Sequence, residues 1–329
     1  MTKDNYLIFT VNGGAGKNVL ATAVVKAIKN AKPESKIIVI TAYKEVWMYN
    51  PSVYRTYTFG NTPNFYKDYI QDKDNVEILN LEPYSTNDYI LKKKSLIEIW
   101  CDLVNVPYNN EKPELFFNQR EIEFAENQRN LRDNPIMLIQ TNGGSPQEMK
   151  VSWMRDMPLS NAQDLVQHFS NNMKVVEKYG KNFRIIQIRR DDQPALQGVE
   201  QFRGNLRELM VLIKYSEKRV FIDSVCQHIA AALDKPSTVV WVRNSPKVLG
   251  YKIHDNIVTN VEDEIDVLFD SFLEPYDIQG NVYQCPFKEG TVLFNTQDLI
   301  ESIVNQNAVF DAVEEMQIDN KTKNKENKK

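Results

Sequence analysis

The sequence predicts an α/β protein with two doubly wound lobes. Short apolar runs alternate with helical segments bounded by glycine or proline, and this alternation occurs twice along the chain. The length of 329 residues is enough for two domains, and 42% hydrophobic with 26% charged residues is typical of globular proteins. We place the lobes at 1–133 and 134–275, a further segment at 276–318, and a disordered lysine-rich tail at 319–329.

The first lobe opens with a strand, a glycine turn and a helix. The apolar run at 6–11 leads into a glycine-rich turn at 12–16, and apolar residues recur at helical spacing over 19–30. Lys32-Pro33 ends this helix. The other elements expected are strands at 36–41 and 76–81 and helices at 95–106 and 119–133.

The second lobe begins after Asn134-Pro135, where the strand–turn–helix pattern restarts. The first elements are a strand at 135–140 and a second glycine turn at 142–144. Further strands are expected at 183–188, 219–222, 237–242 and 256–261, and helices at 161–179, 205–216 and 224–233.

Composition and charge exclude several classes of protein. No apolar run approaches 18 residues, so we expect no transmembrane helix, and the polar residues 1–4 do not resemble a secretory signal. The net charge of −4 argues against a surface devoted to nucleic-acid phosphates. Cys101, Cys226 and Cys285 are widely spaced and accompany only three histidines, which favours reduced thiols in a cytoplasmic protein over a zinc site.

The first glycine turn reads Asn12-Gly13-Gly14-Ala15-Gly16-Lys17-Asn18 and is compatible with a nucleotide loop, in which Gly14 and Gly16 would lie near a phosphate. A P-loop would need glycine in place of Val11 and a hydroxyl residue in place of Asn18, while a dinucleotide fingerprint would need glycine in place of Val19. Neither a kinase nor a dehydrogenase is well supported. The alternative interpretation is a tight turn between strand and helix.

A second segment, residues 220–236, gives a stronger signal. A strand ends in Asp223-Ser224 and a helix opens directly after it, so that the free N–H groups of its first turn would suit a diphosphate. His228 follows one turn later, where it could face the same crevice. The structural alternative makes Asp223-Ser224 a helix cap and His228 a half-buried histidine of the core.

This segment resembles the heptosyltransferase-like glycosyltransferases of family 9. Their signature is a strand, then Asp-Ser/Thr-Gly-x-x-His, an alanine-rich helix, a Lys/Arg-Pro pair and a further strand, which correspond here to residues 220–241. The opening at 12–28, the loop at 139–158 and the helix start at 204–209 extend the resemblance, in chain order, over residues 6–275.

The resemblance implies a GT-B fold, in which two Rossmann-like lobes face a cleft. It also implies inverting, metal-independent transfer of a sugar from a nucleotide-sugar co-substrate, with no cofactor, and a segment at 276–318 that returns to the first lobe. Asp223 would contact the sugar, and Ser224 with the N–H groups of Val225 and Cys226 would hold the diphosphate beside His228. Further donor-side candidates are Lys150 or Arg155 for the phosphates, and Arg189, Asp191 and Asp192 for the ribose or base.

Two positions depart from the family pattern. Val225 replaces the glycine that follows Asp-Ser/Thr, and Asn18 replaces the acidic residue that usually provides the general base. Because an amide does not accept a proton at neutral pH, another carboxylate would be needed. Asp88 is the candidate from the sequence, with a solvated loop aspartate as the alternative interpretation.

The acceptor is less well defined by the sequence. Nine aromatic residues lie between positions 43 and 69, where they could stack on sugars or nucleobases or form ordinary core, and Lys92-Lys93-Lys94 could hold an anionic acceptor. The family favours a bacterial surface glycan, with peripheral membrane contact compatible with that role. The alternatives are a phage-type enzyme that glycosylates hydroxymethylated bases in DNA, in the host cytoplasm, and a non-catalytic sugar-nucleotide-binding protein.

Overall fold

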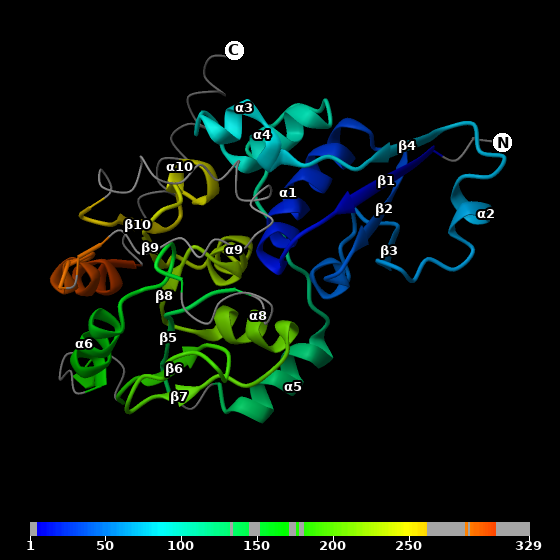
Figure 1. The fold of residues 1–329 in the computed structure, drawn as a ribbon. Helices are drawn as coiled ribbons and strands as arrows, with labels where there is room; N and C mark the ends of the chain where they lie inside the picture. Colours follow the sequence, from blue (N-terminus) through cyan, green and yellow to red (C-terminus); the bar gives the residue numbers. More distant parts are fainter. Residues whose placement is uncertain are drawn as a thin grey trace, which may run out of the picture.

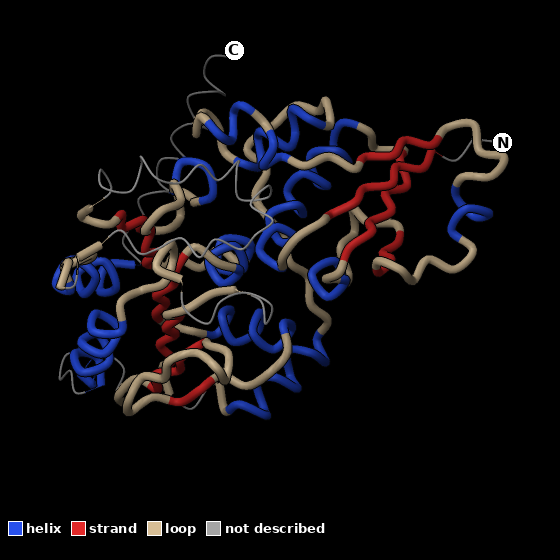
Figure 2. The backbone as a smooth tube through the Cα atoms, viewed as in Figure 1, coloured by secondary structure: helices blue, strands red, loops and turns tan. Residues whose placement is uncertain are grey.

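The computed structural model describes residues 5–131, 134–144, 152–170, 176–177, 181–261, 287–288 and 290–306. Within these residues the chain forms two parallel sheets, each accompanied by helices (Figure 1; Figure 2). The two-lobed α/β architecture predicted from the alternation of strands and helices is therefore confirmed.

The first sheet has the strand order β3-β2-β1-β4. Its strands are β1 (Asn5–Val11), β2 (Ser35–Thr41), β3 (Arg55–Thr58) and β4 (Val76–Leu79). Alternate side chains of β1 enter different cores, since Leu7 and Phe9 belong to one apolar cluster whereas Tyr6 and Ile8 belong to another. This period of two explains why the strand reads as a continuous apolar run.

The helices of the first lobe begin at identifiable caps. α1 (Ala15–Ala31) starts after Gly14, and α4 (Leu96–Leu103) starts at Ser95, whose hydroxyl accepts a hydrogen bond from the Glu98 amide. The shorter elements are η1 (Lys44–Trp47), α2 (Phe65–Tyr69), η2 (Pro83–Ser85) and α3 (Asn87–Ile90).

The second sheet has six parallel strands in the order β10-β9-β8-β5-β6-β7. They are β5 (Ile136–Gln140), β6 (Arg184–Ile188), β7 (Glu200–Gln201), β8 (Lys218–Ile222), β9 (Thr238–Trp241) and β10 (Asp255–Val258). The helices are α6 (Leu159–Ser170), α8 (Leu206–Tyr215), α9 (Val225–Ala232) and α10 (Pro246–Leu249). None of the helices in the described part of the chain is long and apolar enough to cross a membrane.

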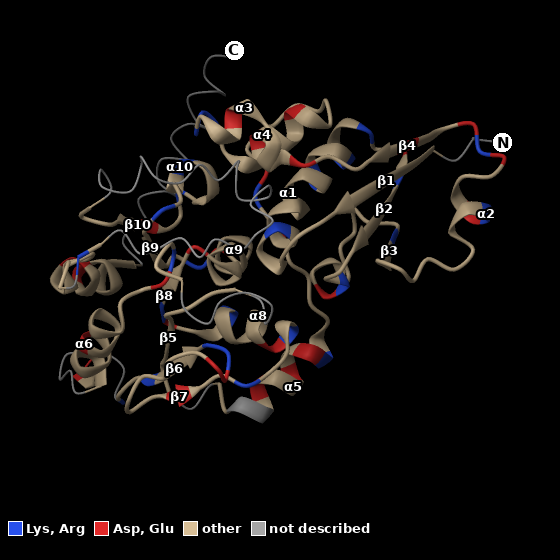
Figure 3. Ribbon diagram, in the orientation of Figure 1, with Lys and Arg blue, Asp and Glu red and all other residues tan. Residues whose placement is uncertain are grey.

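Helix α5 (Gln119–Arg129) belongs by sequence to the first lobe but packs on α8 of the second (Figure 1). Arg207 of α8 donates to both carboxylate oxygens of Glu121, at 3.0 and 2.9 Å, and charges of both signs meet where α5 approaches α8 (Figure 3). The same guanidinium donates to the carbonyl oxygens of Glu45 and Phe116 at 3.1 and 2.6 Å. Arg207 thus fixes the connection between the lobes.

One apolar core extends through both lobes. The same cluster contains Val24 and Ile28 of α1 in the first lobe and Ile229 and Ala230 of α9 in the second, and these two helices pack directly against each other (Figure 1). The lobes therefore meet through an apolar helix–helix contact as well as through Arg207.

The described part of the C-terminal segment packs on the second lobe. A helix over 296–306 buries Leu299 and Ile303 in the second lobe's own core, and the Gln306 amide donates to the Arg219 carbonyl oxygen at 2.6 Å. These residues do not cross back to the first lobe as expected. The other residues of the segment (276–286, 289 and 307–318) and the tail at 319–329 lie outside the described residues.

Candidate functional site

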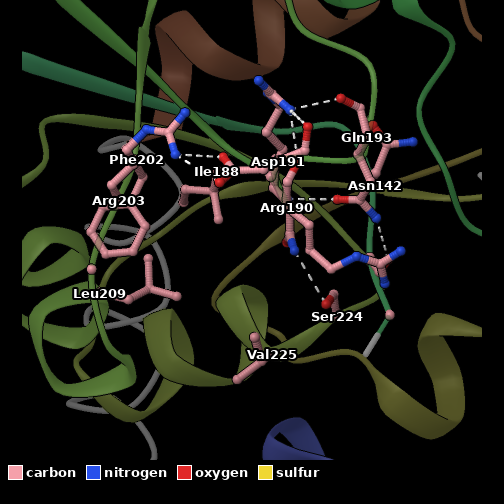
Figure 4. Close-up of a pocket in the computed structure, with 15 residues that line it drawn as sticks. Asn142, Ile188, Arg190, Asp191, Gln193, Phe202, Arg203, Leu209, Ser224 and Val225 are labelled. Atoms are coloured by element: carbon pink, nitrogen blue, oxygen red, sulfur yellow. Dashed lines mark hydrogen bonds and ion pairs between the residues drawn. The ribbon is translucent and has the colours of Figure 1, made fainter. Parts of the chain in front are cut away.

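A cavity of about 440 Å³ lies at the carboxyl ends of β5, β6 and β8 (Figure 4). The chain leaves β5 towards β6 on one side, while β8 flanks β5 on the other, so the strand order reverses between β5 and β8. Ligands of open α/β sheets bind at such a switch point. The cavity is lined by Gln140 and Asn142 after β5, by the 188–193 loop after β6, by Phe202, Arg203, Gly204 and Leu209, and by Ser224 and Val225 after β8.

The turn after β5 forms one wall of the cavity. The buried carboxylate of Asp156 accepts hydrogen bonds from the Asn142 side chain at 2.7 Å and from the Ser152 amide at 2.7 Å, and burial raises the pKa of this carboxyl. Gly143 leaves little room for a side chain, because an added Cβ would lie 3.2 Å from Ile222 Cδ1 and 3.3 Å from Arg155 Nε. The turn therefore brings Arg155 close to the cavity wall.

Gln140 presents an unused acceptor at the cavity. Its side-chain nitrogen donates to Ser224 Oγ at 3.2 Å, whereas its buried Oε1 has no hydrogen-bond partner among the described residues. A buried acceptor without a partner costs free energy unless a ligand donor reaches it. The sequence analysis did not single out Gln140, although its place at the end of a buried strand before a glycine turn is a usable signal.

The N-terminus of α9 provides the second wall. Ser224 is the N-cap residue, but its hydroxyl makes no capping hydrogen bond to the described backbone, so it does not satisfy the first-turn N–H groups of α9. Val225 and Ser224 line the cavity, with the end of α1 below Val225 in Figure 4. Burial raises the pKa of the Cys226 thiol, and this residue is wholly enclosed.

Asp223 comes just before α9, and His228 lies on the face of α9 that contacts Gly16 of the first lobe. Asp223 is buried, accepts a hydrogen bond from Asn244 at 2.5 Å, and has its pKa raised by burial. His228 Nδ1 is 2.7 Å from the Tyr251 hydroxyl, and burial, with a smaller effect of His254, lowers the pKa of His228 to about 3. His228 is therefore neutral at physiological pH.

Gly16 brings the first lobe to this side of α9. A Cβ at Gly16 would lie 2.9 Å from His228 Cδ2 and 3.5 Å from the Val225 Cα, so glycine permits the close contact between α1 and α9. Gly14, which precedes α1, has no atom of the described residues within 4 Å of an added Cβ. The two glycines predicted at a phosphate are thus in different settings, and only Gly16 touches the second lobe.

Arg189 shapes the cavity through its own loop. Its guanidinium donates to Gln201 Oε1 at 2.6 Å and to the carbonyl oxygens of residues 190, 191 and 193 at 2.7 to 3.0 Å. Asp191 pairs with Arg203 at 2.7 Å, whereas Asp192 pairs with Arg190 at 3.0 Å. Lys150 lies outside the described residues.

The two residues considered for proton transfer lie away from the cavity. Asn18 is fully buried, where its Oδ1 accepts from Trp47 Nε1 at 3.1 Å and from Thr41 Oγ1, and its Nδ2 donates to the Gly14 carbonyl at 3.1 Å. Its polar atoms are therefore occupied within the first lobe. Asp88, in α3, is half-buried and lies 3.8 Å from both Lys93 Nζ and Lys94 Nζ.

The aromatic stretch divides into core and surface. Tyr57, Phe65 and Tyr69 pack edge-to-face on one another, and the Tyr57 and Tyr69 hydroxyls are 3.2 Å apart. By contrast, Tyr54, Phe59 and Tyr66 are exposed. Much of the cluster is therefore ordinary packing.

Comparison with known proteins defines the fold. No protein-family model matches the sequence, and no curated protein matches it. Among solved structures, the glycosyl transferase family 9 protein of Veillonella parvula has a TM-score of 0.64 at 13% identity, over 93% of this chain and 98% of that one. The chain therefore has the GT-B fold of the family 9 glycosyltransferases, which confirms the architecture that the resemblance implied.

Two further structures are similar over most of this chain. The ADP-heptose lipopolysaccharide heptosyltransferase II of E. coli has a TM-score of 0.54 at 13% identity, over 82% of this chain and 96% of that one. The heptosyltransferase TibC of enterotoxigenic E. coli, in complex with ADP-D-β-D-heptose, has a TM-score of 0.57 at 14% identity, over 95% of this chain and 77% of that one. At these identities the likeness establishes the fold.

Proposed function

We propose that this protein is a glycosyltransferase that transfers a sugar from a nucleoside-diphosphate donor to an acceptor hydroxyl, with inversion and without a metal ion. The observation that carries the proposal is the cavity at the β5/β8 switch point, where the N-terminus of α9 and the unpartnered Gln140 acceptor meet. A volume of about 440 Å³ is in the range of small-molecule sites. The heptosyltransferase TibC, which has the same fold, binds an ADP-sugar.

The donor would lie across the cavity with its diphosphate at α9. The amides of Val225 and Cys226 and the positive end of the helix would hold the phosphate oxygens, and Arg155, beside Gly143, would add a cation. Phe202 and the 188–193 loop would enclose the nucleoside. The sugar would then extend past Ser224 towards Asp223 and the first lobe.

This placement accounts for the chemistry expected of the chain's own groups. When the acceptor oxygen bonds to the anomeric carbon, the bond from that carbon to the diphosphate breaks, and negative charge grows on the departing phosphate. The amides of α9 and the Arg155 guanidinium would face that charge, which is how preorganised dipoles lower a barrier. Neutral His228 would border the sugar without adding a charge.

The acceptor we propose is a hydroxyl of a bacterial surface glycan. The alternative of a non-catalytic sugar-nucleotide-binding protein is favoured by one observation, the buried amide of Asn18 at the position of the family's acidic residue. The alternative acceptor is DNA, which is offered to the protein beside the glycan. Binding of the protein to DNA would weaken steeply as the salt concentration rises.

The test is calorimetric titration with ADP, UDP, GDP and CDP and with the matching nucleotide sugars. Arg155→Gln should weaken binding of the recognised diphosphate by about 10-fold or more, because a charge-assisted contact is worth about 1.5–3 kcal/mol. Asp223→Asn should weaken binding of the nucleotide sugar more than binding of the nucleoside diphosphate alone. Lys112→Gln, which removes a cation paired with Asp234 on the surface, is the control.

The outcomes separate the alternatives. No binding by any nucleotide refutes the proposal. Binding without transfer to glycan or DNA acceptors, under conditions where the donor saturates the protein, identifies a binding module. Transfer that persists in EDTA supports the metal-free reaction, and loss of transfer in EDTA that added metal restores refutes that part.

A further inference from the structure

The first sheet has a switch point of its own, and a charged pair occupies it. From β1 the chain continues to β2 and β3 on one side of the sheet, whereas β4 flanks β1 on the other side. At the carboxyl ends of β1 and β4, Lys17 of α1 meets Glu82, with Nζ 2.7 and 2.6 Å from the two carboxylate oxygens. Sequence analysis missed this pair, because its members are 65 positions apart.

The pair is built as one fixed cation and one accessible carboxylate. Lys17 is buried, and its Nζ lies 4.8 Å from the centre of the Tyr84 ring and 5.2 Å from that of Trp100. Burial lowers the pKa of Lys17, while the hydrogen bond and the charge of Glu82 act in the opposite direction. The Glu82 side chain, in contrast, remains 43% exposed. One edge of the carboxylate is thus held by the ammonium while the side chain keeps access to solvent.

This carboxylate lies next to the contact between the lobes. Gly16, the residue before Lys17, abuts His228 and Val225 of α9. Tyr84, two residues after Glu82, lies close enough to Asp223 for that carboxylate to raise the pKa of its phenol, after burial and Tyr89, and Glu82 acts on it as well. Glu82 and Asp223 therefore approach the same tyrosine from opposite lobes.

The other candidates for a base are less suitable. The side chain of Asn18 is an amide whose polar atoms are already hydrogen-bonded. Asp88, on α3, lies close to the ammonium groups of Lys93 and Lys94, which follow that helix. Asp223 is buried in the donor lobe, where Asn244 donates to it. Glu82 is on the acceptor lobe, at the edge that faces the donor lobe, and is partly open to solvent.

We propose that Glu82 is the general base of the sugar transfer and that Lys17 is the residue that positions it. This inference rests on the proposed function. The acceptor hydroxyl gives its proton to the Glu82 carboxylate as its oxygen bonds to the anomeric carbon. The bond between that carbon and the diphosphate oxygen breaks, and the electron pair leaves with the nucleoside diphosphate.

The test is the rate of sugar transfer by Glu82→Gln, measured with the donor that the wild type binds. We expect kcat to fall by about 10²- to 10⁴-fold, the usual contribution of general base catalysis, while the dissociation constant of the nucleoside diphosphate stays within about twofold. Glu82→Asp should retain part of the rate.

Glu77→Gln is the matched control. Glu77 is on β4, is 44% exposed and pairs with Lys32 at 2.5 Å. The variant therefore removes the same kind of lysine–glutamate ion pair, but at the opposite end of the strand. It should transfer sugar at the wild-type rate. Lys17→Met should lower kcat while the dissociation constant of the nucleoside diphosphate stays near the wild-type value, because Glu82 would lose the cation that holds its carboxylate, and Lys17→Arg should recover part of the rate.

These measurements distinguish a wrong assignment of Glu82 from a wrong proposed function. If the wild type neither binds a nucleotide sugar nor transfers one, the proposed function is wrong and this inference is wrong with it. If the wild type transfers sugar and Glu82→Gln does so at a similar kcat, only the assignment of Glu82 is wrong. A large loss in Asp88→Asn with little effect in Glu82→Gln would assign the base to Asp88.

Discussion

Gly16→Ala tests the contact between α1 and α9, on which the arrangement of the two lobes depends. The added Cβ would lie 2.9 Å from His228 Cδ2, whereas carbon atoms pack best at about 3.5–4.0 Å, so about 0.6 Å or more must be gained. His228 cannot easily turn away, because it is 6% exposed and hydrogen-bonded to Tyr251 at 2.7 Å. The helices must therefore move apart.

The magnitude follows from two opposing effects. Overpacking of a core costs about 1–3 kcal/mol, and replacing glycine by alanine within a helix returns up to about 1 kcal/mol. We expect the free energy of unfolding of Gly16→Ala to fall by about 1–2 kcal/mol. The affinity for the donor diphosphate should fall too, since α9 carries Ser224 and Val225.

Urea unfolding of Gly16→Ala beside Gly14→Ala is the assay. An added Cβ at Gly14 meets no described atom within 4 Å and the backbone φ is −74°, so the change there should stay below about 1 kcal/mol. If Gly16→Ala is as stable as the wild type and binds the diphosphate equally well, the reasoning about the interlobe contact is wrong.

Two further predictions concern stability. Arg207→Met should lower the free energy of unfolding by about 3–5 kcal/mol in urea, because Glu121 would stay partly buried without its cation, and adding Glu121→Gln should recover part of the loss; a loss below 1 kcal/mol would contradict this role. Burial is the main cause of the low pKa values of His228, about 3, and His254, about 4, in the folded protein. In the unfolded chain the pKa of a histidine is about 6.5. The unfolded chain therefore binds protons first as the pH falls, and between pH 7 and pH 5 each histidine should remove about 2 kcal/mol of stability, measured by urea unfolding at the two pH values. A stability that is level across this interval, or a His254→Gln variant with the wild-type pH dependence, would contradict it.

Much of the fold could be predicted because its signals are local. The buried strands β1, β2, β5 and β8 read as apolar runs, since helices or loops cover them, and the glycine turns mark where they end. β3 was not predicted, because its four residues RTYT lie at a sheet edge and only Tyr57 among them is buried.

The candidate site was predictable only where it is contiguous in the sequence. Ser224, Val225 and His228 follow one another at the start of α9, so a single segment indicated them. Lys17 and Glu82 come together only through the pairing of β1 with β4. The burial of Asn18 likewise depends on Thr41 and Trp47, which no local pattern connects to it.

The apolar core that runs through α1 and α9 also limits how the protein can move. Lobes joined by a packed apolar contact respond by small sliding of helices rather than by swinging open about a hinge. Separating them would expose Ile229 and Ala230 to water, so the two lobes should also unfold together as one cooperative unit. Substrates would then enter and leave along the open side of the cavity while the lobes stay in contact.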